Sequence, residues 1–490
     1  MKKKFVLGSR GWVEAFVNVL NSDPEYQSAA KDWEDPIVIL MTGLPPKLRE
    51  YFQSDAVGCW FDLYHGRCRS FELVKSIDEK PSPIVLYGMY EKNRDGQSKP
   101  HHSSCNRTGQ GQRKHGEAII QRWRVFGFRQ RFEESFDGVF GVNDMRAARW
   151  HGSQDIRVED VDEPRLRVDS DALVRPTAAC ICGTDMHLYK GDITAVPGTI
   201  IGHEFVGVVE KVGPSVKKFH EGDRAISSCR IADGECWFCR HGFYAQCVNI
   251  NIYGMGPVYG ESLDGCFAEL VRVPYADTVL IPAPPNVPDE KLVTVGDSLA
   301  TGHQSMVHGG MREGEFVVVI GCGPVGLYSG MFAKILGASQ VVVADVSAER
   351  LEYAKRIGFE TINAAEVDVA EEVRAMTDGV GADFVVEAVG RSQEPLLKAV
   401  ETVRRKGTVS VVGFHLQEYI IPSGMLWLTE KTLVFSIGDA IKHSETLLKY
   451  IKNNRIDPSV VITHLKKLDE IPQAFEMFAK QQALKVMITL

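Results

Sequence analysis

The sequence predicts an α/β protein in which a β-rich domain is joined to a parallel sheet wrapped by helices, with a smaller α+β module at the N-terminal end. Two observations favour this class. From residue 316 onward, apolar runs typical of buried strands alternate with helical segments, which is the pattern of a parallel sheet covered by helices. Between residues 145 and 290, β-rich segments are separated by Gly and Pro, as a barrel-like domain requires.

The N-terminal module covers residues 1–90. Trp12, Phe16 and Leu20 recur at helical spacing, and Pro36–Met41 is expected to form a strand. The opening of the module resembles bacterial SCP2-like sterol-carrier domains in three segments, Gly8–Phe16, Leu20–Tyr26 and Asp32-Trp33. This resemblance implies a tunnel for a lipid or acyl ligand, and it carries no catalytic motif.

Residues 91–144 form a basic, irregular segment. Its part 91–131 holds ten Lys or Arg against three acidic residues, with little hydrophobic periodicity. One interpretation is a basic linker without a packed core. The other is a stretch translated out of frame, because an SCP2-like domain should continue here with apolar strands and a closing helix. Under either interpretation the lipid-carrier fold is incomplete.

Two further domains are expected after this segment. Residues 145–295, completed by residues 440–490, form the β-rich domain, and residues 296–439 form the parallel-sheet domain. The predicted strands of the parallel sheet are Phe316–Ile320, Val341–Ala344, Phe384–Ala388 and Thr408–Val412. The predicted helices between them are Leu327–Leu336, Ala348–Ile357 and Leu396–Val403. Two further strands return to the β-rich domain, Pro458–His464 and Lys485–Thr489.

Composition excludes several classes of protein. With 490 residues, 44% hydrophobic and 24% charged, the chain is a globular protein of two to four domains. The net charge is −8, and residues 1–144 hold 21 Lys or Arg against 19 acidic residues, so nucleic acid is not the expected partner. No apolar run reaches the ~18 residues of a membrane span. The apolar run after Lys2–Lys4 is too short for a signal peptide, and the spacing of the eleven cysteines favours a reducing cytoplasm.

A glycine-rich motif joins the first predicted strand of the parallel sheet to a helix, and it reads Gly321-Cys-Gly323-Pro324-Val325-Gly326. Glycines at these positions let the backbone approach a pyrophosphate, which the helix N-terminus then binds. Asp345 follows the next strand at the distance expected of a carboxylate that bonds the adenosine ribose. An acid there repels a 2′-phosphate and favours NAD, whereas the nearby Arg350 keeps NADP as the alternative.

Two groups of metal-ligating residues precede this motif. Cys182, His203 and Asp297 are widely separated, with Glu204 directly after His203, and ligands from distant loops leave one zinc position open for a substrate. The second group is closely spaced, as in a structural zinc site, and consists of Asp233, Cys236, Cys239 and Cys247. A metal that polarises an alcohol beside a hydride-accepting cofactor predicts alcohol oxidation.

The span 145–490 resembles the zinc-dependent medium-chain alcohol dehydrogenase family. The matching blocks are Gly202–Gly207, Asp264-Gly265 and Ala268–Pro274. Gly296–Gly302 is similar to a subgroup like the formaldehyde dehydrogenases, in which an Asp replaces the third Cys ligand. The resemblance implies a GroES-like β-barrel catalytic domain and a Rossmann domain with a doubly wound parallel sheet.

The resemblance also implies roles around the catalytic zinc. Cys182, His203 and Asp297 would hold the ion. Glu204 would lie beside it, either as support or as an exchangeable ligand. Asp185 would orient the His203 imidazole, because metal-bound histidines usually donate their other ring nitrogen to such a partner.

Three residues acquire substrate and cofactor roles from the same resemblance. Thr184 would place its hydroxyl against the substrate oxygen. His187 would pass the proton through the ribose to solvent, which suits an imidazole near its ordinary pKa. Thr301 would pack against the nicotinamide.

The closely spaced group departs from the family pattern at its first position. The family has four cysteines at positions matching 233, 236, 239 and 247, and here the first is Asp233. Aspartate also ligates zinc, so Asp233 with Cys236, Cys239 and Cys247 can close a tetrahedral site. Cys229 is an alternative fourth ligand if the loop folds back.

The resulting hypothesis is a zinc- and NAD-dependent dehydrogenase of an alcohol, a polyol or a hydroxymethyl adduct, cytoplasmic and homo-oligomeric. The alternatives are a zinc-free quinone or enone reductase, which would lack the ligands, and a lipid carrier with an inactive dehydrogenase half. The substrate pocket is expected to draw on loops near Tyr189, Tyr253–Val258, His303 and Trp427.

Overall fold

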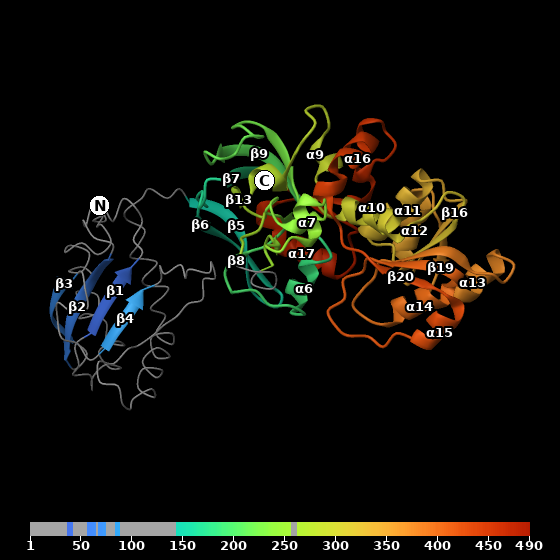
Figure 1. Ribbon diagram of the computed structural model, residues 1–490, viewed down its shortest axis with the longest axis horizontal. Coiled ribbons are helices and arrows are strands. Elements are labelled where there is room, and N and C mark those ends of the chain that lie inside the picture. The colour runs from blue at the N-terminus through green and yellow to red at the C-terminus, as the bar shows by residue number, and fades with distance from the viewer. Residues whose placement is uncertain (1–36, 43–55, 65–66, 75–83, 89–143, 256–261) are drawn as a thin grey trace. The chain divides into compact units, whose positions relative to one another are not determined.

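The computed structural model describes residues 37–42, 56–64, 67–74, 84–88, 144–255 and 262–490. The chain divides into two compact units, residues 1–142 and 143–490. The described strands of unit 1 form one sheet in the order β3-β2-β1-β4, with β1 antiparallel to β2 and parallel to β4 (Figure 1). They are β1 (Ile37–Thr42), β2 (Ala56–Tyr64), β3 (Arg67–Val74) and β4 (Ile84–Gly88). The strand predicted at Pro36–Met41 is therefore confirmed, whereas the helix predicted around Phe16 and the segment 91–143 lie outside the described residues.

The β-rich part of unit 2 contains a seven-stranded and a three-stranded sheet. The larger sheet has the order β14-β10-β9-β7-β22-β21 with β13 paired to β7, and the smaller has the order β6-β5-β8. The strands of the larger sheet are β7 (Ala172–Cys180), β9 (Phe205–Val212), β10 (Arg224–Ser227), β13 (Val271–Val273), β14 (Leu280–Pro282), β21 (His464–Lys467) and β22 (Val486–Thr489). Those of the smaller sheet are β5 (Asp144–Gly152), β6 (Asp155–Asp162) and β8 (Thr199–Ile200), and β11 (Arg230–Ile231) pairs separately with β12 (Asn251–Ile252).

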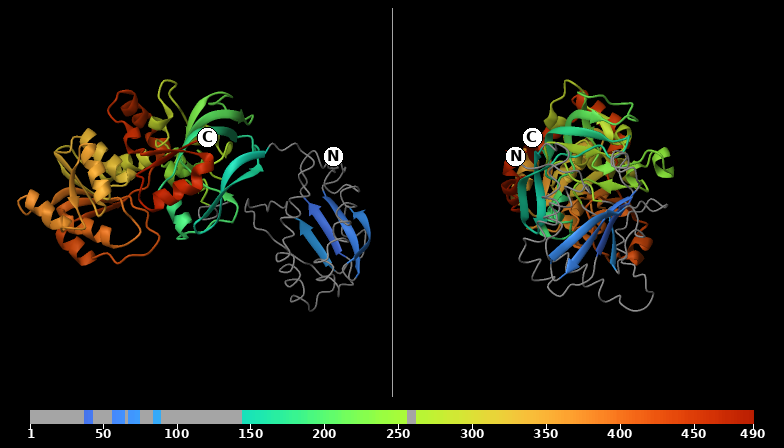
Figure 2. Two further views of the ribbon diagram at one scale, coloured as in Figure 1. Left: turned by 180° about the vertical axis from the view of Figure 1, so that it is seen from behind. Right: turned by 90° about the vertical axis from the view of Figure 1, so that its left-hand side faces the viewer.

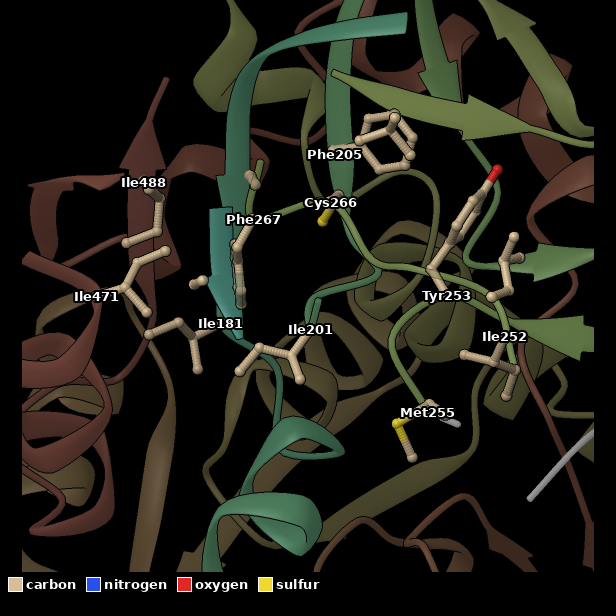
Figure 3. Close-up of a cluster of buried hydrophobic side chains, with 14 of the residues drawn as sticks. Ile181, Ile201, Phe205, Ile252, Tyr253, Met255, Cys266, Phe267, Ile471 and Ile488 are labelled. Atoms are coloured by element: carbon tan, nitrogen blue, oxygen red, sulfur yellow. The ribbon is translucent and has the colours of Figure 1, made fainter. Parts of the chain in front are cut away.

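An apolar cluster holds these sheets together (Figure 3). Its fully buried members include Ile181 after β7, Phe205 at the start of β9, Phe267, and Ile488 on β22. Burying one such side chain contributes about 1.5–3 kcal/mol. Because β22 pairs antiparallel with β7, the cluster fixes the C-terminal strand beside the ends of β7 and β9.

The second part of unit 2 is a six-stranded parallel sheet in the order β17-β16-β15-β18-β19-β20. This is the strand order of a Rossmann-type dinucleotide fold. All five residues of the central strand β15 are buried, as expected of a parallel strand covered on both faces. The strands are β15 (Phe316–Ile320), β16 (Gln340–Asp345), β17 (Glu360–Asn363), β18 (Ala382–Glu387), β19 (Val403–Val411) and β20 (Thr432–Phe435).

Helices cover this sheet and link it to the β-rich part (Figure 2). Those of the parallel-sheet part are α10 (Ser298–Gly309), α11 (Pro324–Ile335), α12 (Ala348–Arg356), α13 (Val369–Met376), α14 (Glu394–Thr402), α15 (Ser423–Thr429) and α16 (Ala440–Lys452). The others are α6 (Asp185–Lys190), α7 (Trp237–Arg240), α8 (Ala276–Val279), α9 (Asp289–Leu292) and α17 (Ile471–Ala479), with short 3₁₀ turns at Tyr244–Gln246, Pro458–Val461 and Leu468–Glu470. Within the part of the chain that the structure describes, no helix combines the length and apolar character needed to cross a membrane.

The structure confirms the predicted strands and helices of the parallel sheet and adds β17, β20, α13 and α15. One prediction was wrong. Pro458–Val461 is a 3₁₀ turn, because the Asp457 carboxylate accepts hydrogen bonds from the backbone N–H and the hydroxyl of Ser459. The strand β21 begins at His464, the last residue of the predicted strand, and runs to Lys467. The strand predicted at Lys485–Thr489 is confirmed as β22.

A buried histidine pair lies between α10 and α16. His303 is 4% exposed and His443 is 9% exposed, and their rings lie 4.7 Å apart. Burial lowers the pKa of each imidazole to about 4. In the unfolded chain these imidazoles bind protons near pH 6.5, whereas in the folded chain they do so only near pH 4. The free energy of unfolding therefore falls as the pH drops from about 6.5 toward 4.

Replacing one member of this pair should reduce acid lability. The free energy of unfolding should fall from pH 7 to pH 5 in both proteins. This fall should be about 1–2 kcal/mol smaller in His303→Leu than in the parent protein. Urea unfolding at the two pH values measures this difference. His220→Gln, at an exposed surface histidine, is the control and should behave as the parent. An unchanged pH dependence in His303→Leu would contradict the prediction.

Candidate metal centre and dinucleotide site

The three widely separated metal-ligand candidates meet at one point of unit 2. Cys182 follows β7, His203 precedes β9 and Asp297 immediately precedes α10. Their ligand atoms all lie within 4.8 Å of one another. Asp297 Oδ2 is 3.2 Å from Cys182 Sγ and 3.4 Å from His203 Nε2. One sulfur, one imidazole nitrogen and one carboxylate oxygen form a donor set suited to zinc, and three protein ligands leave a fourth position open.

Asp185 fixes the geometry of this set. Its Oδ2 accepts a hydrogen bond from the backbone N–H of Cys182 at 2.8 Å, and its Oδ1 lies 3.1 Å from His203 Nδ1. With Nδ1 directed at a carboxylate, Nε2 of His203 is the nitrogen left to face Asp297. Although burial opposes it, the Asp185 carboxylate holds the pKa of His203 well above its usual range.

Glu204 does not lie among the three ligand atoms but in a buried ion pair beside them. Its Oε2 is 2.5 Å from Lys485 Nζ, and the two side chains are 0% and 1% exposed. Its Oε1 accepts hydrogen bonds from the hydroxyl of Ser298 at 2.6 Å and from its backbone N–H at 3.2 Å. Burial alone would lower the pKa of Lys485, but the Glu204 carboxylate holds it well above its usual range.

This network connects the neighbours of all three ligand candidates. Glu204 follows His203, Ser298 follows Asp297, and the backbone N–H of Ile181, next to Cys182, donates to Val486 O at 3.1 Å. Lys485, which the sequence analysis did not single out, is the residue on the C-terminal segment that closes the arrangement. Its only signal in the sequence is a single cation before an apolar strand.

Cys229 does not join the closely spaced cysteine group, so the alternative in which it serves as the fourth ligand there is wrong. Its buried Sγ lies 3.3 Å from Asp297 Oδ1, on the other carboxylate oxygen from Cys182 and His203. The guanidinium of Arg230 places Nη1 3.8 Å from the same sulfur and 2.9 Å from Gly438 O. The strand β11 begins at Arg230 and leads to Asp233 and the closely spaced cysteines. Cys229 precedes this strand, and its side chain contacts Asp297 instead of that group.

The closely spaced group forms a second cluster. The ligand atoms of Asp233, Cys236, Cys239 and Cys247 lie within 4.8 Å of one another. Asp233 Oδ1 accepts from the backbone N–H of Cys236 at 2.9 Å, and its Oδ2 accepts from the amide of Asn249 at 2.9 Å. Despite partial burial, these hydrogen bonds lower the pKa of Asp233. A carboxylate that stays ionised is the form that ligates a metal.

Thr184 directly precedes α6, and His187 lies on this helix. Thr184 Oγ1 is 3.8 Å from Cys182 Sγ, one of the three metal-ligand candidates. His187 is buried on α6, and burial lowers the pKa of its imidazole although Asp192 opposes this. Asp192, whose Oδ2 lies 2.9 Å from His187 Nδ1, was not identified from the sequence.

The glycine-rich motif forms a tight turn from β15 into α11. Gly321 has a φ of +106°, and a Cβ on Gly326 would lie 1.9 Å from Gly321 O, so both positions require glycine. Gly323 directly precedes α11, which begins with Pro324 and Val325, so the helix N-terminus faces the turn. The geometry matches a pyrophosphate-binding turn.

The other predicted cofactor residues surround this turn. Asp345 at the end of β16 accepts hydrogen bonds from the backbone N–H groups of Cys322 at 2.7 Å and Ser347 at 2.9 Å. Arg350 lies on α12, and its buried Nε has no hydrogen-bond partner among the described residues. The hydroxyl of Thr301 donates to Asp297 O at 3.0 Å, one helical turn from the metal-ligand candidate.

The residues near which the substrate pocket is expected lie in different surroundings. Tyr189 and Tyr253 are buried in the core of the β-rich part, where the Tyr253 hydroxyl lies 3.1 Å from Ser227 Oγ. His303 is buried against His443, and Trp427 on α15 is 81% exposed. Residues 256–258 lie outside the described residues.

Comparisons with known proteins agree with this arrangement. Residues 168–284 match the family model "Alcohol dehydrogenase GroES-like domain", and residues 324–453 match "Zinc-binding dehydrogenase". An uncharacterised zinc-type alcohol dehydrogenase-like protein of Bacillus subtilis is 32% identical over 365 residues, which cover 68% of this chain and 96% of the relative. The structure of an alcohol dehydrogenase from Thermus sp. ATN1 is similar with a TM-score of 0.67 and 37% identity, covering 70% of this chain and 99% of that chain. A putative zinc-binding dehydrogenase from Sinorhizobium meliloti bound to NADP has a TM-score of 0.63 and 25% identity, with 71% and 100% coverage.

Breaking the buried ion pair should destabilise unit 2. Lys485→Met leaves the Glu204 carboxylate buried without its counter-charge and should lower the unfolding free energy by about 3–5 kcal/mol. The double variant Glu204→Gln with Lys485→Met should recover most of this loss. Urea unfolding measures both, and Lys480→Met at a surface ion pair is the control, with a change under about 1 kcal/mol. Equal losses in the single and double variants would contradict the prediction.

Zinc retention should depend on Asp233. After dialysis against a chelator, the parent protein should keep about two zinc ions per chain, Asp233→Ala about one, and Asp233→Cys again about two, because a thiolate restores the fourth ligand. Metal analysis of the dialysed proteins measures these contents. Full retention in Asp233→Ala would show that the three cysteines bind zinc without the carboxylate.

Proposed function

Because the chain belongs to the zinc-type medium-chain alcohol dehydrogenase family and is a zinc-dependent oxidoreductase of CH–OH donors, we propose that it oxidises an alcohol, a polyol or a hydroxymethyl adduct with NAD as the hydride acceptor. The observation that carries this proposal is the convergence of Cys182, His203 and Asp297 within 4.8 Å. A zinc-free quinone or enone reductase has no use for such a set, and neither has a lipid carrier with an inactive dehydrogenase half.

Cys182, His203 and Asp297 would hold zinc with one position left for the substrate hydroxyl. Zinc in such a site acts as a Lewis acid that makes a bound hydroxyl more acidic. Asp185 orients His203, and Glu204 with Lys485 holds the segments that carry the ligands. Thr184 Oγ1 lies 3.8 Å from Cys182 Sγ, and its hydroxyl would receive the substrate proton.

His187 would take that proton onward. Its lowered pKa keeps the imidazole neutral at physiological pH, which is the form that accepts a proton. NAD supplies the hydride acceptor, and the protein contributes the position and charge around it. The turn at Gly321–Gly326 would hold the pyrophosphate and Thr301 would pack near the nicotinamide.

We also propose a homo-oligomer and a lipid ligand. A homo-oligomer is supported by the apolar side chains at the last strand of the parallel sheet and its neighbouring helix, where Trp427, Leu428 and Phe435 are 81%, 74% and 57% exposed. Such an edge is a surface that a second copy covers. A lipid ligand for residues 1–90 is supported only by the SCP2-like resemblance.

Turnover should depend on Cys182. NADH formation from NAD and a panel of alcohols, polyols and hydroxymethyl-thiol adducts should be lost in Cys182→Ser, because the substitution removes a zinc ligand. Absorbance of NADH measures the rate, and Cys266→Ala, at a buried cysteine outside both clusters, should remain active. Undiminished turnover in Cys182→Ser would exclude this set as the catalytic zinc site.

Cofactor choice should depend on Asp345. The parent protein should prefer NAD over NADP at least ~10-fold in kcat/KM, because the carboxylate repels a 2′-phosphate. Asp345→Ser should reduce this preference, since it removes the repelling carboxylate while Arg350 can pair with the phosphate, and Arg350→Gln in the same background should restore it. Initial rates with both cofactors measure the ratio, and a parent preference for NADP would overturn the assignment.

A further inference from the structure

The environment of His187 defines which of its nitrogens carries the proton. Nδ1 lies 2.9 Å from Asp192 Oδ2. A carboxylate only accepts hydrogen bonds, so Nδ1 donates, and Nε2 of the neutral ring keeps its lone pair. Among the residues that the structure describes, none hydrogen-bonds to Nε2. The imidazole is therefore held in the tautomer that accepts a proton at Nε2.

Residues from the dinucleotide edge complete this environment. Arg391, four residues after β18, places Nη2 3.8 Å from the same Asp192 oxygen. The ring of Phe414, three residues after β19, lies 4.9 Å from the His187 ring. Both loops leave the carboxyl ends of parallel strands, which is where dinucleotides bind in this type of sheet. The histidine of the β-rich part is thus enclosed by side chains of the other part.

The loop that carries Arg391 is held in an unfavourable backbone conformation. Arg391 has a φ of +66°, a left-handed conformation that non-glycine residues rarely adopt. Its N–H donates to Phe414 O at 3.1 Å, and Glu387 Oε1 accepts from the N–H groups of Val389 at 2.8 Å and Gly390 at 2.7 Å. These bonds impose the conformation that brings the guanidinium to Asp192. Strain of this kind is concentrated at functional positions.

We propose that Asp192 is a positioning residue for His187 and that Arg391 anchors its carboxylate from the dinucleotide edge. The inference rests on the proposed function, which makes His187 the group that takes the substrate proton onward from Thr184. Asp192 selects the tautomer with a free Nε2, and Arg391 prevents the half-exposed carboxylate from turning toward solvent. The charged groups around His187 are Asp192, Arg391 and Lys190.

The test is the pH profile of kcat for alcohol oxidation with NAD. Asp192→Asn should lower kcat at least ~10-fold near neutral pH, because the Asn amide donates to Nδ1 and selects the wrong tautomer. KM for NAD and alcohol should change less than about twofold. Asp192→Glu should restore most of the rate, and Asp155→Asn, at a surface ion pair, is the matched control and should match the parent.

The apparent pKa of the acid limb of this profile distinguishes the two roles. It would not change if Asp192 and Arg391 only stabilised the fold. Asp192 raises and Arg391 lowers the pKa of His187. Arg391→Asn, which tolerates the left-handed backbone, should therefore move the limb up by roughly 0.5 unit, and Asp192→Asn should move it down. Shifts of the same sign, or a profile of Asp192→Asn equal to that of Asp155→Asn, would overturn the inference.

His187→Gln separates this inference from the proposed function. Loss of the acid limb in His187→Gln together with opposite shifts in the other two variants supports both. Loss of the limb in His187→Gln with no change in Asp192→Asn overturns the role of Asp192 and leaves the function intact. An unchanged profile in His187→Gln removes the proton-accepting role and the inference with it.

Discussion

The buried ion pair between Glu204 and Lys485 is the constraint on which the metal centre depends. It places two opposite charges in the core, where each loses its hydration, and it persists because the pair is close and Ser298 satisfies the other carboxylate oxygen. Since Glu204 and Ser298 directly follow His203 and Asp297, the pair sets the position of two ligand candidates at once. Hydrogen bonding between the Ile181 N–H and Val486 O aligns the third.

Close contacts also fix the residues predicted to bind the dinucleotide. Close contacts exclude a side chain at Gly321 and at Gly326, and Asp345 ties the turn to the end of the next strand by accepting from the Cys322 N–H. Unit 2 thus presents two locally rigid groups of residues, one on loops of the β-rich part and one at the ends of the parallel strands. Oxidation of an alcohol by hydride transfer uses two such groups, because a metal acts on the hydroxyl oxygen while the cofactor takes the hydride from the carbinol carbon.

The sequence was most informative where a site is made by neighbours along the chain. The glycine turn, Asp345 and the lobe around Cys236 are local patterns, and the structure places each as expected. Cys182, His203 and Asp297 were grouped as zinc ligands by residue type and wide separation, and the family resemblance added that they hold one catalytic ion. Lys485, Cys229 and Asp192 were missed or misplaced because their roles arise from contacts between distant segments, and an isolated Lys, Cys or Asp carries no periodic or spacing signal. The apolar run at Pro458–Val461 does not form the predicted strand, because the Ser459 N–H donates a local hydrogen bond to the Asp457 carboxylate and so favours a turn.

The position of Lys485 on the segment leading into β22 has a consequence for biosynthesis. During translation, every metal-ligand candidate of both clusters leaves the ribosome before Lys485 does, because domains emerge in order from the N-terminal side. Until β22 pairs with β7, Glu204 has no counter-charge and the segments after β7 and before α10 are not aligned. The order of synthesis therefore places all the ligand candidates ahead of the cation that neutralises Glu204, and the enclosed form of the site requires the segment that synthesis delivers after them.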